Sequence, residues 1–270
     1  MIHFCLILYN LYATNTTYWS RELSPSSEFT AKILQLFNKV ILCKDTLENA
    51  RDFVRKMLFN YNPINFPMGQ STAASADIID IFMGETSYGS INYKCDTCSY
   101  EGRGLALSGM TVLIANDDVP RSTNTIAKFL DLGRNSELSG KLCKECVRRN
   151  RPEKYYTASQ TITKNPQFIA FELVHQTHII KPNIKLDWHG PDGKNTLILC
   201  GLIYGGQSHF VSRIIDRSGR VWYHDGASTG PSMMEERAIT MIDDTDWLLK
   251  TPCGRTLIAC MYRNKAVGAG

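Results

Sequence analysis

The sequence predicts an α+β protein in which helices come first and a mostly antiparallel sheet follows. Two observations carry this prediction. Apolar residues recur at three-to-four spacing in the first part of the chain, as on one face of a helix. Farther along, short segments rich in β-branched and aromatic residues are separated by Gly, Pro, Asn and Asp turns. With 270 residues and 43% apolar content, the chain can form a globular core.

Two helices are expected early in the chain, and a short one after a break. The apolar positions of the first two are Phe29, Ile33, Leu36, Phe37 and Val40, then Leu47, Ala50, Phe53, Val54 and Met57. Asp45 and Glu48 form a capping-box-like pair at the start of the second helix. Pro63, Pro67 and Gly69 interrupt the pattern, after which "ADIIDIFMG" predicts a short helix entering a strand.

The start of the chain, "MIHFCLILYNLY", is apolar enough to suggest a signal peptide. It lacks a basic leading region and a small-residue cleavage site, and it is too short to span a bilayer. No longer apolar stretch occurs, so no membrane partner is expected. An apolar start without a polar cap also fits a chain whose true beginning is missing.

The expected strands follow one another closely in the second part of the chain. In order, they are "SINYKC", "LALSGMTVLI", "TITKNPQFIAFELVH", "TLILCGLIYGG", "HFVSRIIDRSG" and "RVWYHDG". Short strands separated by turn residues favour a mostly antiparallel sheet.

Two Cys-x-x-Cys pairs, Cys95/Cys98 and Cys143/Cys146, are the most specific chemical signal. Each pair places two thiolates on one turn, and two such turns together provide the four-sulfur tetrahedral shell of a structural zinc site. A degenerate site without metal and a pair of disulfides are the alternatives. The other cysteines, an odd number, favour a reducing compartment, so we expect a cytoplasmic or nuclear protein. They are Cys5, Cys43, Cys200, Cys253 and Cys260.

A second signal lies in "CGLIYGGQSHFVSRIIDRSGRVWYHDGAST". A strand ending at Tyr204 leads into Gly205 and Gly206, His209 opens the next strand, and a third strand ends at Asp225. On a meander, the Asp225 carboxylate and the His209 imidazole can lie side by side, which gives two members of a nucleophilic triad. The alternative is an ordinary strand histidine followed by an Asp-Gly turn.

The order of these motifs resembles the ubiquitin-specific protease family of cysteine deubiquitinases, over roughly residues 60 to 264. The family's strand-borne Phe-x-Gly matches Phe82-Met83-Gly84, and its two Cys-x-x-Cys knuckles match the cysteine pairs. Its Pro-anchored strand matches "NPQFIAFELVH", and its closing strand matches "TLIACMYRN". Its catalytic histidine box and the sequence after it match Gly205, Gly206, His209, Phe210, Trp222, Tyr223 and Asp225.

The resemblance implies a papain-like, thiol-dependent deubiquitinase that cleaves the isopeptide bond after the C-terminal glycine of ubiquitin. A cysteine thiolate would attack the glycine carbonyl, with His209 as base and then acid and Asp225 as its orienting carboxylate. Gly205 and Gly206 would line a channel narrow enough to select glycine. Ubiquitin or ubiquitinated proteins would be the partners, with a structural zinc and no catalytic cofactor.

By the same resemblance, residues 1–264 are expected to form one ubiquitin-specific protease-like domain, followed by a tail at 265–270. Residues 1–84 would be a helical thumb, 85–175 the fingers with the zinc knuckles, and 176–264 the palm with the histidine box.

The sequence departs from the family pattern at the nucleophile. The family carries an Asn-x-Gly-Asn-Thr-Cys-Tyr-type box, and no such box occurs here. Because "CLILYN" resembles the helix after that box, the nucleophile is expected before Met1, and Cys5 is expected to be a buried helix residue. Thr72 and Ser75 stand where the family carries acids, and Ser208 replaces the usual glycine before the histidine.

Two other function classes stay open. A truncated or inactive chain would bind ubiquitin without cleaving it. A zinc-ribbon nucleic-acid binder is the minor alternative, suggested by the basic residues around the second cysteine pair. They are Lys141, Lys144, Arg148, Arg149, Arg151 and Lys154. A solvated charged face explains these residues equally well, and the net charge of +4 does not favour nucleic acid.

Overall fold

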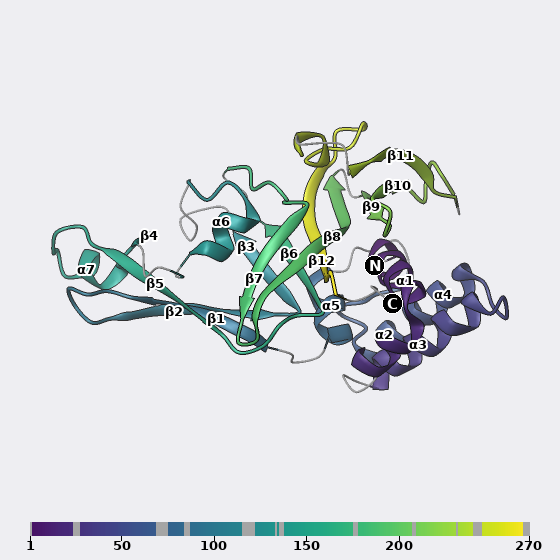
Figure 1. Cartoon of the computed structure of the whole chain (residues 1–270), viewed down its shortest axis with the longest axis horizontal. Helices are drawn as coiled ribbons and strands as arrows, with labels where there is room; N and C mark the ends of the chain where they lie inside the picture. The colour runs from purple at the N-terminus through teal and green to yellow at the C-terminus, as the bar shows by residue number, and fades with distance from the viewer. Residues whose placement is uncertain are drawn as a thin grey trace.

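A computed structural model of the chain describes residues 2–23, 28–68, 75–83, 87–114, 122–132, 134, 138–174, 178–206, 209–230, 232–239 and 245–266. A group of helices, a large sheet and a slender extension make up this structure (Figure 1). The fold is therefore α+β with mostly antiparallel sheets, as the sequence predicts. No helix in the described ranges is long and apolar enough to cross a membrane.

The N-terminal region forms the helical lobe. Its helices are α1 (Ile2–Thr14), α2 (Thr16–Leu23), α3 (Glu28–Ile41), α4 (Leu47–Tyr61) and α5 (Ser75–Met83). The expected cap of α4 is corrected: Thr46, not Asp45, is the N-cap, because its hydroxyl accepts the Asn49 N–H at 3.2 Å. Asp45 accepts from the Thr46 N–H and from the Asn49 side chain instead.

Another correction concerns the expected Phe-x-Gly strand. Phe82 and Met83 end helix α5, and Gly84 lies outside the described residues. The reason is packing, because Ile78, Ile79 and Phe82 recur at helical spacing and are buried against the other helices.

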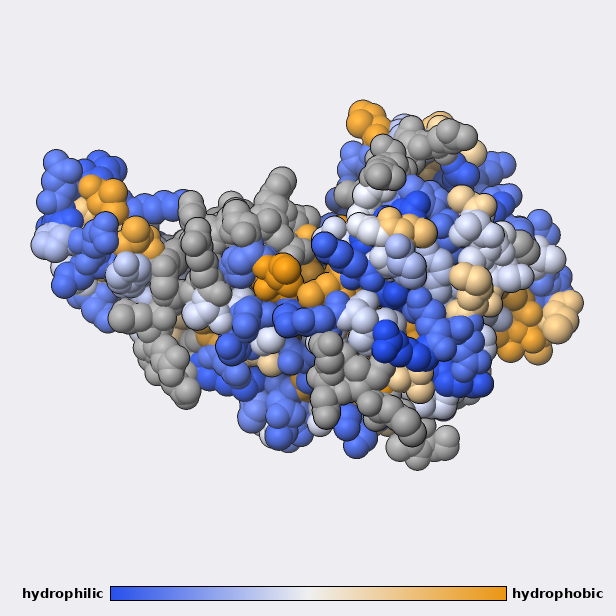
Figure 2. Space-filling view, turned by 90° about the horizontal axis from the view of Figure 1, so that it is seen from above, coloured by the Kyte–Doolittle hydropathy of each residue, from blue (hydrophilic) through white to orange (hydrophobic). Residues whose placement is uncertain are grey.

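A four-stranded antiparallel sheet in the order β2-β1-β5-β4 forms the slender extension, which we call the fingers (Figure 1). Its strands are β1 (Ser87–Lys94), β2 (Glu101–Ser108), β4 (Leu138–Leu142) and β5 (Tyr155–Ile162), with helix α7 (Lys144–Arg148) at the tip. Hydrophobic and hydrophilic atoms are mixed at this tip (Figure 2). Leu142 and Val147 are exposed there, so the extension has little apolar core of its own at its end.

An eight-stranded sheet, which we call the palm, has the order β11-β10-β9-β8-β12-β6-β3, with β7 also paired to β8. The strands are β3 (Met110–Ile114), β6 (Phe168–Val174), β7 (Lys185–Gly190), β8 (Gly193–Gly206), β9 (His209–Ile215), β10 (Arg220–His224), β11 (Met234–Ala238) and β12 (Thr256–Asn264). Two short helices accompany them, α6 (Ile126–Asp131) and η3 (Asp246–Leu248). Among the described residues, the strands of this sheet pair antiparallel except β3 with β6.

Strands β3 and β6 lie within the residue range expected for the fingers, yet they pair within the palm sheet. Both faces of β8 are covered, which explains its near-continuous apolar run. Leu197 and Leu199 belong to one buried cluster, while Cys200 and Ile203 belong to the cluster under the helical lobe. A strand buried on both faces loses the apolar–polar alternation of a half-exposed strand.

Helix α1 lies directly against β8. Nearly all of its large side chains are buried, including Phe4, Ile7 and Leu11, so the apolar start of the chain is a core helix. A Cβ atom on Gly201 of β8 would lie only 2.6 Å from Ile7 Cγ2 and 2.8 Å from Ile7 Cδ1. The missing side chain at Gly201 therefore permits this close approach of helix and sheet.

We expect Gly201→Ala to lower the free energy of unfolding by about 1–3 kcal/mol, since the added methyl group overpacks the α1–β8 interface. Ile7→Ala in the same chain should relieve the clash, so the two substitutions should be strongly non-additive in urea unfolding. Gly226→Ala is the matched control, because its Cβ would meet only His224 Cε1 at 3.8 Å. Additive single and double variants would contradict the contact.

Candidate functional site

The candidate site lies at the edge of the palm where β8 ends and β9 begins. Strand β8 continues through Gly205 and Gly206, beyond the expected end at Tyr204. Gly206 pairs with His209, and Gly205 pairs with Phe210 on one side and Thr256 of β12 on the other. Since β10 runs antiparallel to β9 and ends at His224, the following Asp225 arrives beside His209.

His209 and Asp225 meet through a short hydrogen bond. The imidazole Nε2 lies 2.6 Å from Asp225 Oδ1, so the structure brings these two side chains together as the sequence predicts. Asp225 Oδ1 also accepts the backbone N–H of Ala227 at 3.0 Å. Thr229 fixes the turn, because its hydroxyl donates to the Asp225 carbonyl and accepts the Asp225 N–H. The catalytic roles of the pair stay a prediction.

The carboxylate of Asp225 is held in its ionised form. Burial favours the neutral acid, but the hydrogen bonds from His209 and the Ala227 N–H outweigh it and lower the pKa of Asp225 to about 2. The Asp225 side chain is only 5% exposed, whereas His209 is 33% exposed. The buried Asp225 carboxylate accepts a hydrogen bond from Nε2–H of His209. Nδ1 is therefore the ring nitrogen that can take up and return a proton.

Two further histidines, which the sequence analysis did not assign to the site, lie beside this pair. His3 of α1 places Nδ1 3.1 Å from Ser212 Oγ and 3.4 Å from Nδ1 of His224. Burial lowers the pKa of His3 to about 3 and also lowers the pKa of His224. Both imidazoles are therefore neutral near pH 7, and they join the first turn of α1 to β9 and β10.

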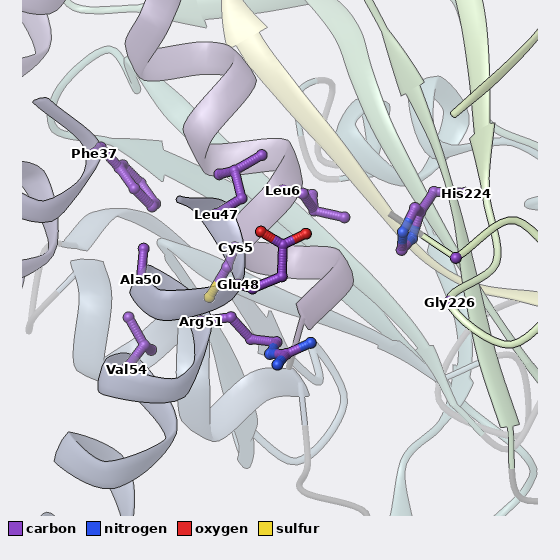
Figure 3. Close-up of a pocket in the computed structure, with 11 residues that line it drawn as sticks. Cys5, Leu6, Phe37, Leu47, Glu48, Ala50, Arg51, Val54, His224 and Gly226 are labelled. Carbon is purple, nitrogen blue, oxygen red and sulfur yellow. The ribbon is translucent and has the colours of Figure 1, made fainter. Parts of the chain in front are cut away.

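A pocket of about 370 Å³ opens between the helical lobe and this edge of the palm (Figure 3). His224 and Gly226 line it from the palm, and Glu48 and Arg51 line it from α4. The other lining residues are Cys5, Leu6, Phe37, Leu47, Ala50, Val54 and Gly230. An apolar cavity with a few polar groups at its rim is typical of a binding site.

Cys5 is the cysteine nearest to the start of α1, and it packs against the buried cluster of the helical lobe. It is half-buried, and in Figure 3 its sulfur lies on the α4 side of the pocket. Burial raises the pKa of the Cys5 thiol to about 11, which disfavours the reactive thiolate. Among the described residues, no cysteine sulfur hydrogen-bonds to His209, whose partner is Asp225.

The four knuckle cysteines converge at the fingertip. Cys95 and Cys146 place their sulfurs 3.7 Å apart, and Cys98 and Cys143 place theirs 3.6 Å apart. All four sulfurs lie within 4.8 Å of one another. Cys143 caps α7 by accepting the Cys146 N–H at 3.4 Å, which holds the second knuckle in place. Tetrahedral bonds of about 2.3 Å need sulfurs about 3.8 Å apart, so the cluster fits a metal ion.

The basic residues near this cluster are partly neutralised. Arg148 and Arg149 both form ion pairs with Glu145 of the same short helix. These pairs account for two of the cations that suggested a nucleic-acid surface. Among the other residues singled out in the sequence, Gly69 to Ala74, including Thr72, and also Ser208 and His175 lie outside the described residues.

The chain was compared with known proteins. No family model and no curated protein matches it. It is similar to a chain of a SAGA Ubp8/Sgf11/Sus1/Sgf73 DUB module, with 10% identity, a TM-score of 0.53, and 98% of this chain covered. Structures of that module bound to monoubiquitin and to ubiquitin aldehyde align with 13% and 12% identity and TM-scores of 0.43 and 0.44, each covering 98% of this chain.

The chain covers 66% of the matched chain in each structure, which is just under two thirds of its length. At 10% identity, the similarity concerns the fold alone. The α+β architecture with antiparallel sheets is thus similar to that of a chain from a deubiquitinase module.

The low pKa of Asp225 predicts a pH-dependent contribution to stability. Its pKa in the folded chain, about 2, lies below the value of about 3.9 for an unfolded aspartate. The ionised carboxylate therefore stabilises the fold above about pH 4, and this contribution is lost as the pH falls through about 2.

We expect Asp225→Asn to lower the free energy of unfolding by about 2 kcal/mol at pH 6, with a difference from the unsubstituted chain that narrows below about pH 4. Urea unfolding between pH 6 and pH 2.5 measures it. Asp187→Asn, which removes an exposed partner of Lys194, should cost less than about 1 kcal/mol. A difference for Asp225→Asn that stays constant with pH would contradict the ionised pair.

Proposed function

We propose that this chain is the ubiquitin-binding catalytic scaffold of a thiol-dependent deubiquitinase. The observation that carries the proposal is the His209–Asp225 hydrogen bond at the palm edge of a chain whose fingers converge on four cysteines. The fold similarity to a chain of a DUB module supports it. The order of the sequence motifs, which resembles that of ubiquitin-specific proteases, supports it independently.

In the proposed reaction, a thiolate attacks the carbonyl carbon of the last glycine of ubiquitin. His209 Nδ1 takes the thiol proton and then delivers it to the leaving lysine amine, which leaves a thioester on the enzyme. Water, activated by the same imidazole, then releases ubiquitin with a free carboxylate. Asp225 keeps the Nε2–H tautomer in place and stabilises the imidazolium that forms between the two proton transfers.

Gly205 and Gly206 are proposed to line the channel for the ubiquitin tail. A Cβ on Gly205 would lie 3.2 Å from both Ile258 Cδ1 and Phe210 Cε1, so a side chain at this strand end would press against these two neighbours. Backbone without side chains leaves a narrow passage, and a narrow passage admits glycine in preference to larger residues.

The metal held by the four cysteines is proposed to be zinc, with a structural role. Four sulfur ligands close the coordination shell and leave no open position, so this site suits folding rather than catalysis. Zinc supplies strong bonds where the fingers bury little apolar area, and it keeps the two knuckles together. No catalytic cofactor enters the proposed reaction.

One observation bears on the alternative of ubiquitin binding without efficient cleavage, which stays open. Cys5 carries a thiol with a pKa of about 11, and within the described part of the chain no cysteine sulfur hydrogen-bonds to His209. His209 and Asp225 are thus the proposed acid–base pair of the reaction, while no described cysteine is assigned as the attacking thiolate.

We expect ¹⁵N-labelled ubiquitin to bind the chain, with signal changes concentrated in its C-terminal tail. Labelling by a ubiquitin vinyl-type probe should be slow, because a thiol with a pKa of about 11 is almost entirely protonated at pH 7.5. His209→Ala should retain binding and lower any turnover of a ubiquitin–fluorophore conjugate by about 10²- to 10⁴-fold.

Cys5→Ser distinguishes Cys5 as the nucleophile from Cys5 as a packing residue. Cys43→Ser is the control, because Cys43 is exposed. Rapid labelling that Cys5→Ser abolishes would make Cys5 the nucleophile and would contradict its assignment as a core residue. A titration that leaves the ubiquitin tail unperturbed would contradict the proposed function itself.

Metal analysis of protein purified without chelator should find about one zinc ion per chain. Cys143→Ser should abolish it and increase amide hydrogen exchange in β1 and β5, while the helical lobe keeps its protection. Cys253→Ser, which changes an exposed cysteine outside the cluster, should leave zinc content and exchange unchanged. Zinc at one per chain in Cys143→Ser would contradict the assigned ligands.

A further inference from the structure

Arg255 lies at the palm edge next to the candidate site, immediately before β12. Its backbone is fixed by a turn, since its carbonyl accepts the Thr251 N–H at 3.0 Å and its N–H donates to Thr251 Oγ1 at 3.1 Å. Gly254 takes a φ of 76° within this turn, a conformation that favours glycine. The starting point of the Arg255 side chain is therefore set by local backbone structure.

The side chain of Arg255 runs along the end of β8 toward Asp225. Its Cγ would lie 3.7 Å from a Cβ placed on Gly206, so the aliphatic stem lies against the glycine. Beyond the stem, Nη1 of the guanidinium is 3.8 Å from Asp225 Oδ2. The absence of a side chain at Gly206 thus leaves a path across the sheet edge, from β12 past β8 to the turn after β10.

Two of the three guanidinium nitrogens of Arg255, Nε and Nη1, are buried, and the group forms an ion pair with the Asp225 carboxylate. The Arg255 side chain is 17% exposed, and its Nε and Nη1 atoms have no hydrogen-bond partner among the described residues. Leaving a buried charge without a counter-charge costs several kcal/mol. The other buried arginine nearby, Arg213, is already bound to Glu236 at 2.6 Å and 3.1 Å.

The two oxygens of Asp225 have different neighbours. Oδ1 accepts from His209 and from the Ala227 N–H, while Oδ2 faces Arg255. The Ser228 side chain also hydrogen-bonds to this carboxylate. Without a cation beside Oδ2, fewer contacts would oppose rotation of the carboxylate about its Cβ–Cγ bond, which would exchange the oxygen offered to His209. A cation beside one oxygen fixes the plane of the carboxylate. Outer partners orient the ligands of metal sites in the same way, through a second contact.

We propose that Arg255 is a positioning residue, which holds Asp225 Oδ2 so that Oδ1 stays directed at His209 Nε2. The role in catalysis rests on the proposed function, because Arg255 acts only through the His209–Asp225 pair. Gly206 is part of the same arrangement, because the absence of a side chain there leaves the space that the aliphatic part of Arg255 occupies.

The proposal is tested by measuring the tautomer of His209 with ¹⁵N NMR on histidine-labelled chain. All variants are compared at the same pH and without ubiquitin. His209→Ala assigns the signals. The unsubstituted chain should show His209 mainly as the Nε2–H tautomer, with a strongly deshielded proton from the 2.6 Å hydrogen bond. In Arg255→Gln the deshielded signal should disappear, and the Nε2–H population should fall about twofold or more, because the carboxylate is no longer held.

Two further variants make the outcome decisive. Arg255→Lys keeps a cation beside Gly206 and should retain the deshielded proton. Arg220→Gln removes an arginine that pairs with Asp216 at the other end of β10, and it should change nothing at His209. Circular dichroism confirms that each variant is folded.

An unchanged His209 tautomer in folded Arg255→Gln overturns the proposal. If Arg255→Gln does not fold, loss of the deshielded proton in folded Arg255→Lys overturns it. The readout needs neither ubiquitin nor turnover. The experiment can therefore exclude Arg255 as a positioning residue while the proposed function holds. It can equally support Arg255 in this role when ubiquitin binding or turnover is absent.

Discussion

The register of β8 against its neighbours is the constraint on which the candidate site depends. Gly206 pairs with His209, and Gly205 pairs with Thr256, so the end of one strand sets the start of β9 and β12 together. A slip of one residue would turn every side chain of a strand to the opposite face. Close packing resists such a slip, because both faces of β8 are buried and Gly201 receives Ile7 of α1.

Electrostatics at this edge follow from one buried carboxylate surrounded by groups of different kinds. Asp225 is kept ionised by hydrogen bonds, with His209 at one oxygen and the Arg255 cation at the other. Burial keeps His3 and His224 neutral, so they add no positive charge that would compete for the carboxylate. Burial also raises the pKa of the Cys5 thiol, which disfavours its thiolate.

The fingers solve a different physical problem. At their tip the sheet is narrow, and apolar side chains such as Val147 are exposed, so burial alone provides little stabilisation. Four cysteine sulfurs within 4.8 Å of one another offer metal bonds in place of an apolar core. Strands β2 and β5 of the fingers are followed along the chain by β3 and β6 of the palm, so short connections join the fingers to the sheet that carries His209.

The sequence by itself determined the features that rest on short-range pattern. Helical periodicity located α3 and α4, turn residues separated the palm strands, Cys-x-x-Cys spacing marked the sulfur cluster, and the meander brought Asp225 to His209. Local pattern was misleading at Phe82, where helical packing prevailed over a motif read as a strand. Only the tertiary structure decided that His3 meets His224 and that Arg255 reaches Asp225. Such contacts join segments far apart in the chain, and they depend on docking angle and side-chain space, for which the sequence carries no periodic signal.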